Sequence, residues 1–180
     1  CKTISDYHTF LYLPEGQGHE ASSIDANTVF AYNSRTVGTA SDVELDDAHG
    51  YRPLMAVTAT EGVWYDRYVN YFDQEENNKQ GLTLYLPYDV TIDNEQIRVY
   101  EFADAQVIDG VPTVTFRRLS DEDGSYHLQA YKPYYAVAVG TDIIDLSNYD
   151  TDVLLPMPPT EDFNVQSSIF NVQSSMFNFR

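Results

Sequence analysis

The residues best suited to bind a ligand are aromatic. Trp64, Tyr65, Tyr68 and Tyr71 lie close together in a chain that holds 15 Tyr, 9 Phe and 1 Trp. Exposed rings stack on sugars and pack in protein interfaces, because each ring has a flat apolar face and, in Tyr and Trp, a polar handle. These four residues are the candidate ligand-binding set, with a glycan or a surface protein as partner. Tyrosine and phenylalanine also favour strands, so a sheet core with cross-strand pairs is the plainer interpretation.

Cys1 is the only cysteine, so the chain forms no internal disulfide. Three interpretations of Cys1 remain open: a nucleophile activated by its own α-amine, a lipidated residue of a mature lipoprotein, or the boundary of a fragment. The boundary is favoured, since the first expected strand begins only a few residues later. The sequence has no Gly-x-Ser-x-Gly elbow and no Gly-rich phosphate loop. We therefore expect no catalytic residues and no enzymatic activity.

Metal-binding patterns are also missing from the sequence. The four histidines show no i, i+4 pairing, and no Cys-x-x-Cys occurs. Asp121-Glu122-Asp123-Gly124 begins like a calcium loop, but its twelfth position is Lys132 instead of Glu. With 28 acidic residues, some carboxylate pair always has the spacing of a glycosidase, so this spacing decides nothing. We expect no metal and no cofactor.

The charge balance excludes two classes of partner. The formal net charge is -18, from 28 acidic and 10 basic residues. A field of this sign repels phosphate backbones and anionic lipid surfaces, so nucleic acid and anionic membranes are not expected partners. No run reaches the roughly 18 apolar residues that a spanning helix needs, so no membrane insertion is expected. Because the chain begins with Cys, we expect any targeting signal to lie upstream.

The elements that must position these residues are strands. Short alternating apolar runs are separated by Gly, Pro, Asn and Asp, a pattern typical of all-β proteins. The fold we expect is an all-β, antiparallel β-sandwich-like domain with a low-complexity C-terminal tail. The expected strands cover residues 10–13, 29–32, 41–47, 55–60, 63–72, 82–86, 97–107, 111–116 and 134–139. A short helix is the alternative for residues 63–72.

One hairpin is predicted from its turn. Asp109-Gly110 lies between two alternating runs, and both residues accept the positive φ angles of a type I′ turn. Pro112 has no amide donor, so we expect it at an edge or among the first residues of its strand.

The expected domain organisation is a module over residues 5–152, followed by a tail over 153–180. The tail begins with a Pro-rich linker and continues with the repeat FNVQSS, which starts at Phe163 and again at Phe170. Two copies are too few for a coiled coil, so the tail is expected to be disordered or loosely β-pairing. The alternative organisation has two smaller β units, divided near the polar segment 73–80.

Three stretches resemble a module of Bacteroidota surface proteins, the BspA-like, leucine-rich-repeat-associated kind. They are TFLYLPEG at 9–16; VELDD, YRP, VTAT and YDR between 43 and 67; and LTLYLPYDV, VYEF, VTF and AYKPY between 82 and 134. Leu82 stands where the family has an aromatic residue, and Tyr85 where it has a cysteine. The resemblance implies a secreted or cell-surface, β-rich domain without known catalytic residues.

These observations lead to one expected function and two alternatives. The expected function is a non-catalytic structural or adhesion module of a secreted or cell-surface bacterial protein. The first alternative is a carbohydrate-binding module, which needs the four rings to be exposed. The second is a hydrolase domain, which needs a pocket with converging polar groups and perturbed carboxylates.

Overall fold

The computed structural model describes residues 10–14, 28–32, 37–47, 51, 53–69, 81–93, 95–120, 123–139, 141 and 143–159. Every regular element among them is a β-strand, which confirms the all-β class. The strands are β1 (Leu11–Pro14), β2 (Thr28–Tyr32), β3 (Val37–Ala40), β4 (Val43–Glu44), β5 (Ala56–Ala59), β6 (Val63–Trp64), β7 (Asp66–Tyr68), β8 (Gly81–Leu84), β9 (Val90–Asp93), β10 (Ile97–Ile108), β11 (Val111–Arg118), β12 (Ser125–Leu128), β13 (Tyr134–Ala138), β14 (Ile143–Asp145) and β15 (Val153–Leu155). Nothing in this part of the chain forms a helix of the length and apolarity that crossing a membrane requires.

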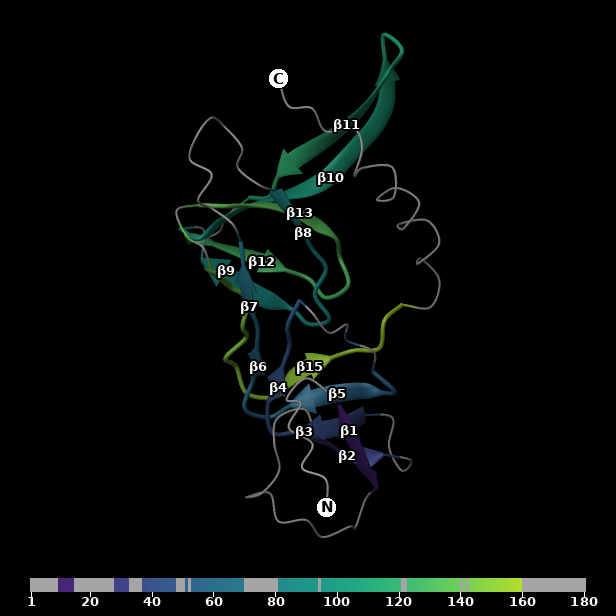
Figure 1. Ribbon diagram of the computed structural model, residues 1–180, viewed down its shortest axis with the longest axis vertical. Helices are drawn as coiled ribbons and strands as arrows, with labels where there is room; N and C mark the ends of the chain where they lie inside the picture. Colours follow the sequence, from purple (N-terminus) through teal and green to yellow (C-terminus); the bar gives the residue numbers. More distant parts are fainter. Residues whose placement is uncertain are drawn as a thin grey trace.

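The first sheet has five strands in the order β1-β2-β3-β5-β15. It is mixed, since β1–β2 and β3–β5 are parallel while β2–β3 and β5–β15 are antiparallel. Along β5, Val57 and Ala59 are buried and Ala56 and Thr58 are half-buried, as the alternating sequence predicted. Figure 1 shows this sheet at the lower end of the molecule.

The second sheet has four antiparallel strands in the order β11-β10-β13-β8. Its inward residues include Leu84, Val99 and Ala136, all fully buried. The antiparallel β9–β12 ribbon lies between the two sheets, where its paired Ile92 and Tyr126 are buried in the same cluster. This layering gives the sandwich-like arrangement (Figure 1).

A single hydrophobic cluster connects these layers. It runs from Val29 and Val57 of the first sheet, through Val63 and Ile144, to Leu84 and its neighbours in the second sheet. Each fully buried aliphatic side chain stabilises the fold by about 1.5–3 kcal/mol. Cluster members come from both sides of the segment 73–80, which itself lies outside the described residues.

The hairpin of β10 and β11 forms as predicted. Asp109 and Gly110 have φ angles of 50° and 80°, the two positive values of a type I′ turn. Pro112 lies on β11, an edge strand, where its missing N–H disrupts no ladder. From residue 102 onward β10 is exposed, and Figure 1 shows the distal hairpin as an arm that projects from the sheet.

The structure divides one expected strand and adds a short strand beyond the expected end of the module. The strand expected over 63–72 is divided into β6 and β7, and residues 70–72 lie outside the described part of the chain. The domain boundary expected at 152 falls one residue before β15, which pairs with β5 and buries Val153 and Leu155. Because the sequence after Leu155 is rich in proline, the residues of this short edge strand were expected to belong to the tail. Cys1, the segment 73–80 and the repeat beginning at Phe163 lie outside the described residues.

Candidate functional site

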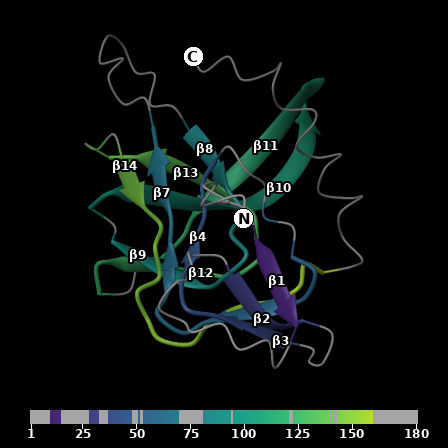
Figure 2. The ribbon, with the colours of Figure 1, turned by 60° about the horizontal axis from the view of Figure 1, so that its bottom comes forward.

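The predicted aromatic residues lie on a two-stranded ribbon made of residues 63–68 and 143–149. Val63 and Asn148 exchange backbone hydrogen bonds of 2.8 Å, and β7 continues the same antiparallel register against β14. The ladder is half formed at Tyr65: its carbonyl accepts from the Leu146 N–H at 2.9 Å, but its N–H donates to Ser147 Oγ at 3.0 Å. The carbonyl that would accept it, on Leu146, accepts instead from the buried Tyr88 hydroxyl at 2.8 Å. Figure 2 shows β7 and β14 side by side.

The two faces of this ribbon differ in exposure. On one face Val63, Ile144 and Leu146 are fully buried in the core. The other face is open and carries Trp64, Asp66 and Tyr68 on one strand, because alternate residues share a face. Across the ribbon, Asp145 pairs with Asp66 and Ile143 pairs with Tyr68. The open face is therefore a row of rings and carboxylates.

Trp64 and Tyr149 form a nearly right-angled pair, which we call the aromatic corner. Their ring centroids are 5.0 Å apart and the ring planes meet at 77°. Both rings remain accessible, at 46% and 58% exposure. Beside this pair, Gly62 lets its backbone lie close to the backbone of Asn148. Its φ is +115°, and a Cβ there would lie 2.7 Å from the Asn148 carbonyl oxygen.

Asp145 fixes the position of the Tyr149 ring. Burial raises the pKa of the Asp145 carboxyl, but the hydrogen bonds it accepts outweigh burial and hold this pKa below its usual range. These bonds come from the Ser147 N–H at 2.9 Å and the Tyr149 hydroxyl at 2.8 Å. The bond to Asp145 in turn raises the pKa of Tyr149. The corner is thus held in place before any ligand arrives.

The four residues proposed from the sequence have separate positions. Trp64 is in the aromatic corner, and Tyr68 is 75% exposed further along the same face. Tyr65 lies on the opposite face, half-buried, and its hydroxyl donates to Asp47 Oδ1 at 2.6 Å, so we remove it from the candidate set. Tyr71 lies outside the described residues.

A small pocket, the near pocket, opens beside the corner. It has a volume of about 330 Å³, and Tyr149 lines it together with Asp89, Thr91, His127 and Asn148. Its polar side chains are held by the backbone. Asp89 Oδ1 accepts from the Ala130 N–H at 2.6 Å, and Asn148 Nδ2 donates to the Asp89 carbonyl oxygen at 2.8 Å.

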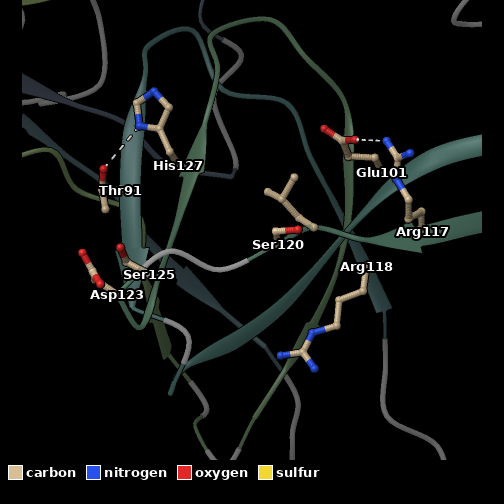
Figure 3. Close-up of a pocket in the computed structure, with 9 residues that line it drawn as sticks. Thr91, Glu101, Arg117, Arg118, Ser120, Asp123, Ser125 and His127 are labelled. Atoms are coloured by element: carbon tan, nitrogen blue, oxygen red, sulfur yellow. Dashed lines mark hydrogen bonds and ion pairs between the residues drawn. The ribbon is translucent and has the colours of Figure 1, made fainter.

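A larger pocket, the far pocket, has a volume of about 780 Å³ and shares Thr91 and His127 with the near one. Figure 3 shows Thr91 and His127 on one side and Glu101 and Arg117 on the other, with Ser120 between them. Thr91 Oγ1 is 3.4 Å from His127 Nδ1, and Arg117 Nη2 donates to Glu101 Oε2 at 3.1 Å.

Glu101 is an anion in this pocket. Its Oε1 accepts a hydrogen bond of 2.5 Å from Lys132 Nζ. This bond is the main reason why the pKa of Glu101 lies below its ordinary value, and the Arg117 bond lowers it further. The carboxylate therefore acts as an acceptor at neutral pH.

Sequence reasoning missed Tyr149, Asp145 and the two pockets. Tyr149 lies far from Trp64 along the chain, and no local pattern signals that residues 63–68 pair with 143–148. Within the described residues, no group of three or more His, Cys, Asp or Glu side chains is placed to hold a metal ion. Comparison of the chain with protein-family models, with curated proteins and with solved structures found no match.

Proposed function

We propose that this chain is a non-catalytic, glycan-binding adhesion module of a secreted or cell-surface protein. The aromatic corner carries the proposal. Trp64 and Tyr149 are exposed, perpendicular and held by a hydrogen-bonded ribbon. Such a corner offers a pyranose ring an apolar floor and an apolar wall, and rings held in advance lose little entropy on binding.

Carboxylates beside the rings supply the polar part of a sugar site. Asp66 and Asp145 lie on the same face as Trp64, and Asp89 lines the adjoining pocket. Ionised carboxylates accept hydrogen bonds from sugar hydroxyls, and a few fixed polar groups among apolar surface set the orientation of a ligand. Rings and acceptors together favour a glycan over a purely apolar partner.

Two carboxylates near the site, Glu101 and Asp145, are poorly suited to the general-acid role of a glycosidase. A glycosidase needs a general acid whose pKa is raised toward neutrality. The pKa values of Glu101 and Asp145 are both lowered by the hydrogen bonds that they accept. Neither residue therefore serves as a general acid. The surface location in the proposal draws its support from the resemblance to BspA-like modules over residues 9–140.

A glycan-array screen, with and without calcium, tests the proposal. We expect the full chain to bind a set of glycans, and Trp64→Ala or Tyr149→Ala to weaken binding about thirtyfold, as for aromatic hot spots worth about 2 kcal/mol. Tyr85→Ala is the matched control, because Tyr85 is a 37% exposed ring outside the ribbon. Circular dichroism establishes that each variant is folded. A silent array, or unchanged binding by folded Trp64→Ala, contradicts the proposal.

A further inference from the structure

The aromatic corner and the two pockets adjoin one another. Tyr149 belongs to the corner and also lines the near pocket. Thr91 and His127 line both the near and the far pocket. Each part of the surface therefore shares a side chain with the next, from Trp64 at one end to Arg117 at the other.

The side that the two pockets share lies on the β9–β12 ribbon. Thr91 and His127 are direct partners in the β9–β12 register, and Ser125 pairs with Asp93 one step further along the same face. The opposite face of this ribbon is anchored by Ile92 and Tyr126, both buried in the core. Packing of Ile92 and Tyr126 in the core fixes the ribbon that carries Thr91 and His127, and so fixes the two pockets relative to each other.

The polar groups along this path are both donors and acceptors. The near pocket has the carboxylates of Asp89 and Asp150, and the far pocket has Ser120 and the Glu101–Arg117 pair. Sugar hydroxyls donate and accept, so they can use both kinds of group. A polyanionic glycan would meet the carboxylates first, in a chain of net charge -18.

We infer that the corner and both pockets form one groove that holds a neutral oligosaccharide lengthwise, with its end in the far pocket. This inference rests on the proposed function and adds the ligand class and the direction of the chain. One sugar stacks in the aromatic corner, the following sugars pass along Thr91 and His127, and the last ones meet Glu101 and Arg117.

The test is isothermal titration calorimetry with neutral oligosaccharides of increasing length. The probes are the cello-, xylo- and malto- series from disaccharide to octasaccharide, together with oligogalacturonates as acidic counterparts. We expect affinity in one neutral series to rise about tenfold or more from disaccharide to hexasaccharide and then to level off. The acidic counterparts should bind more weakly than neutral chains of equal length.

Variants at the two ends separate this groove from the corner alone. Arg117→Ala should reduce hexasaccharide affinity about tenfold and leave disaccharide affinity unchanged. Trp64→Ala should weaken the affinity for both the disaccharide and the hexasaccharide about thirtyfold. Arg117 has a 75% exposed side chain, so its replacement leaves the core intact. Ile108→Ala, on the projecting arm, is the control and should change neither affinity.

Each other outcome has a defined meaning. Affinity that does not depend on length, while Trp64→Ala still abolishes binding, overturns the groove and leaves the proposed function standing. Tighter binding of oligogalacturonates overturns the neutral ligand class. Binding of no oligosaccharide overturns the groove and the proposed function together.

Discussion

Glu101 bonds two side chains through its two carboxylate oxygens, one in a loop and one on the neighbouring strand. Oε1 accepts from Lys132 and Oε2 accepts from Arg117. The Lys132 side chain is 41% exposed, whereas that of Arg117 is 75% exposed. The Lys132 bond is therefore better shielded from water than the Arg117 bond, and we expect it to carry most of the coupling.

Because the pKa of Glu101 is lowered in the folded chain, the free energy of unfolding depends on pH. A carboxyl whose pKa is lower in the folded chain stabilises the fold above its unfolded pKa of about 4.3, and this stabilisation is lost as pH falls through the folded value. We therefore expect the unfolding free energy to fall less steeply below about pH 4.5 in Glu101→Gln than in the unaltered chain. Urea titrations between neutral pH and pH 3 measure this slope.

A double-mutant cycle completes that experiment. Lys132→Gln should reduce the pH dependence of the unfolding free energy by a similar amount. The double variant should reduce it little more than either single change, because the pair acts as a unit. At neutral pH each single change should cost at most about 1 kcal/mol. Additive slopes in the double variant would show that Glu101 and Lys132 are not coupled.

At this scale the sequence predicts burial better than it predicts the site. Alternation identified Val57, Ala59 and Leu84 as inward residues, because a strand with one covered face leaves a period of two. Trp64 and Tyr68 were identified as candidate rings by their place in an aromatic cluster, and not by alternation. Tyr149 was missed because it belongs to the candidate site only through its contact with Trp64, and that contact depends on tertiary pairing.

The strand β10 passes from the core to solvent along its own length. Ile97, at its start, is fully buried, and Ile108, at its end, is 46% exposed on the arm. A two-stranded ribbon with both faces in water is only marginally stable on its own. The arm is thus held by its root in the sheet and by its Asp109-Gly110 turn.

The two isoleucines of β10 provide a matched comparison. Ile97→Ala should cost about 2–5 kcal/mol, since it leaves a cavity in the core. Ile108→Ala should change stability by only about 0.5 kcal/mol, as expected for a surface site. Chemical denaturation of both variants measures the difference. Equal costs would mean that the arm is packed against the rest of the chain.

Turn chemistry explains which elements were predictable. The β10–β11 hairpin is encoded locally, because Asp109-Gly110 favours positive φ whatever surrounds it. The division of the 63–72 strand is not local. At this point the Tyr65 N–H bonds to Ser147 Oγ and the Leu146 carbonyl accepts from the Tyr88 hydroxyl, and these partners lie far from Tyr65 in the sequence.

At the scale of the molecule, β15 attaches the end of the described chain to the first sheet. Val153 pairs with Ala59, and Leu155 pairs with Val57. The sequence predicted neither the order of strands in the sheet nor its parallel pairs, since both depend on contacts between distant segments. Composition alone placed the end of the module just before β15.

Adjacent leucines of β15 test whether the molecule unfolds as one unit. Leu155 is fully buried and Leu154 is 51% exposed. Leu155→Ala should cost about 2–5 kcal/mol, and Leu154→Ala only about 0.5 kcal/mol. Because one cluster connects all layers, Leu155→Ala should lower the midpoints of far-ultraviolet circular dichroism and of Trp64 fluorescence together. A dichroism transition that shifts while the Trp64 transition stays in place would show two independent units.

The pairing of β15 with β5 also has a kinetic consequence. The first sheet cannot be completed until the chain has been synthesised as far as Leu155, because that residue fills the place beside Val57. Contacts between such distant segments require a long loop to close before any stabilisation is gained, and folds dominated by them form in milliseconds to seconds. While the chain is still emerging, β5 is an exposed sheet edge. The first sheet is therefore completed only after Leu155 has been synthesised, and until then the β5 edge is open to pairing with the wrong strand.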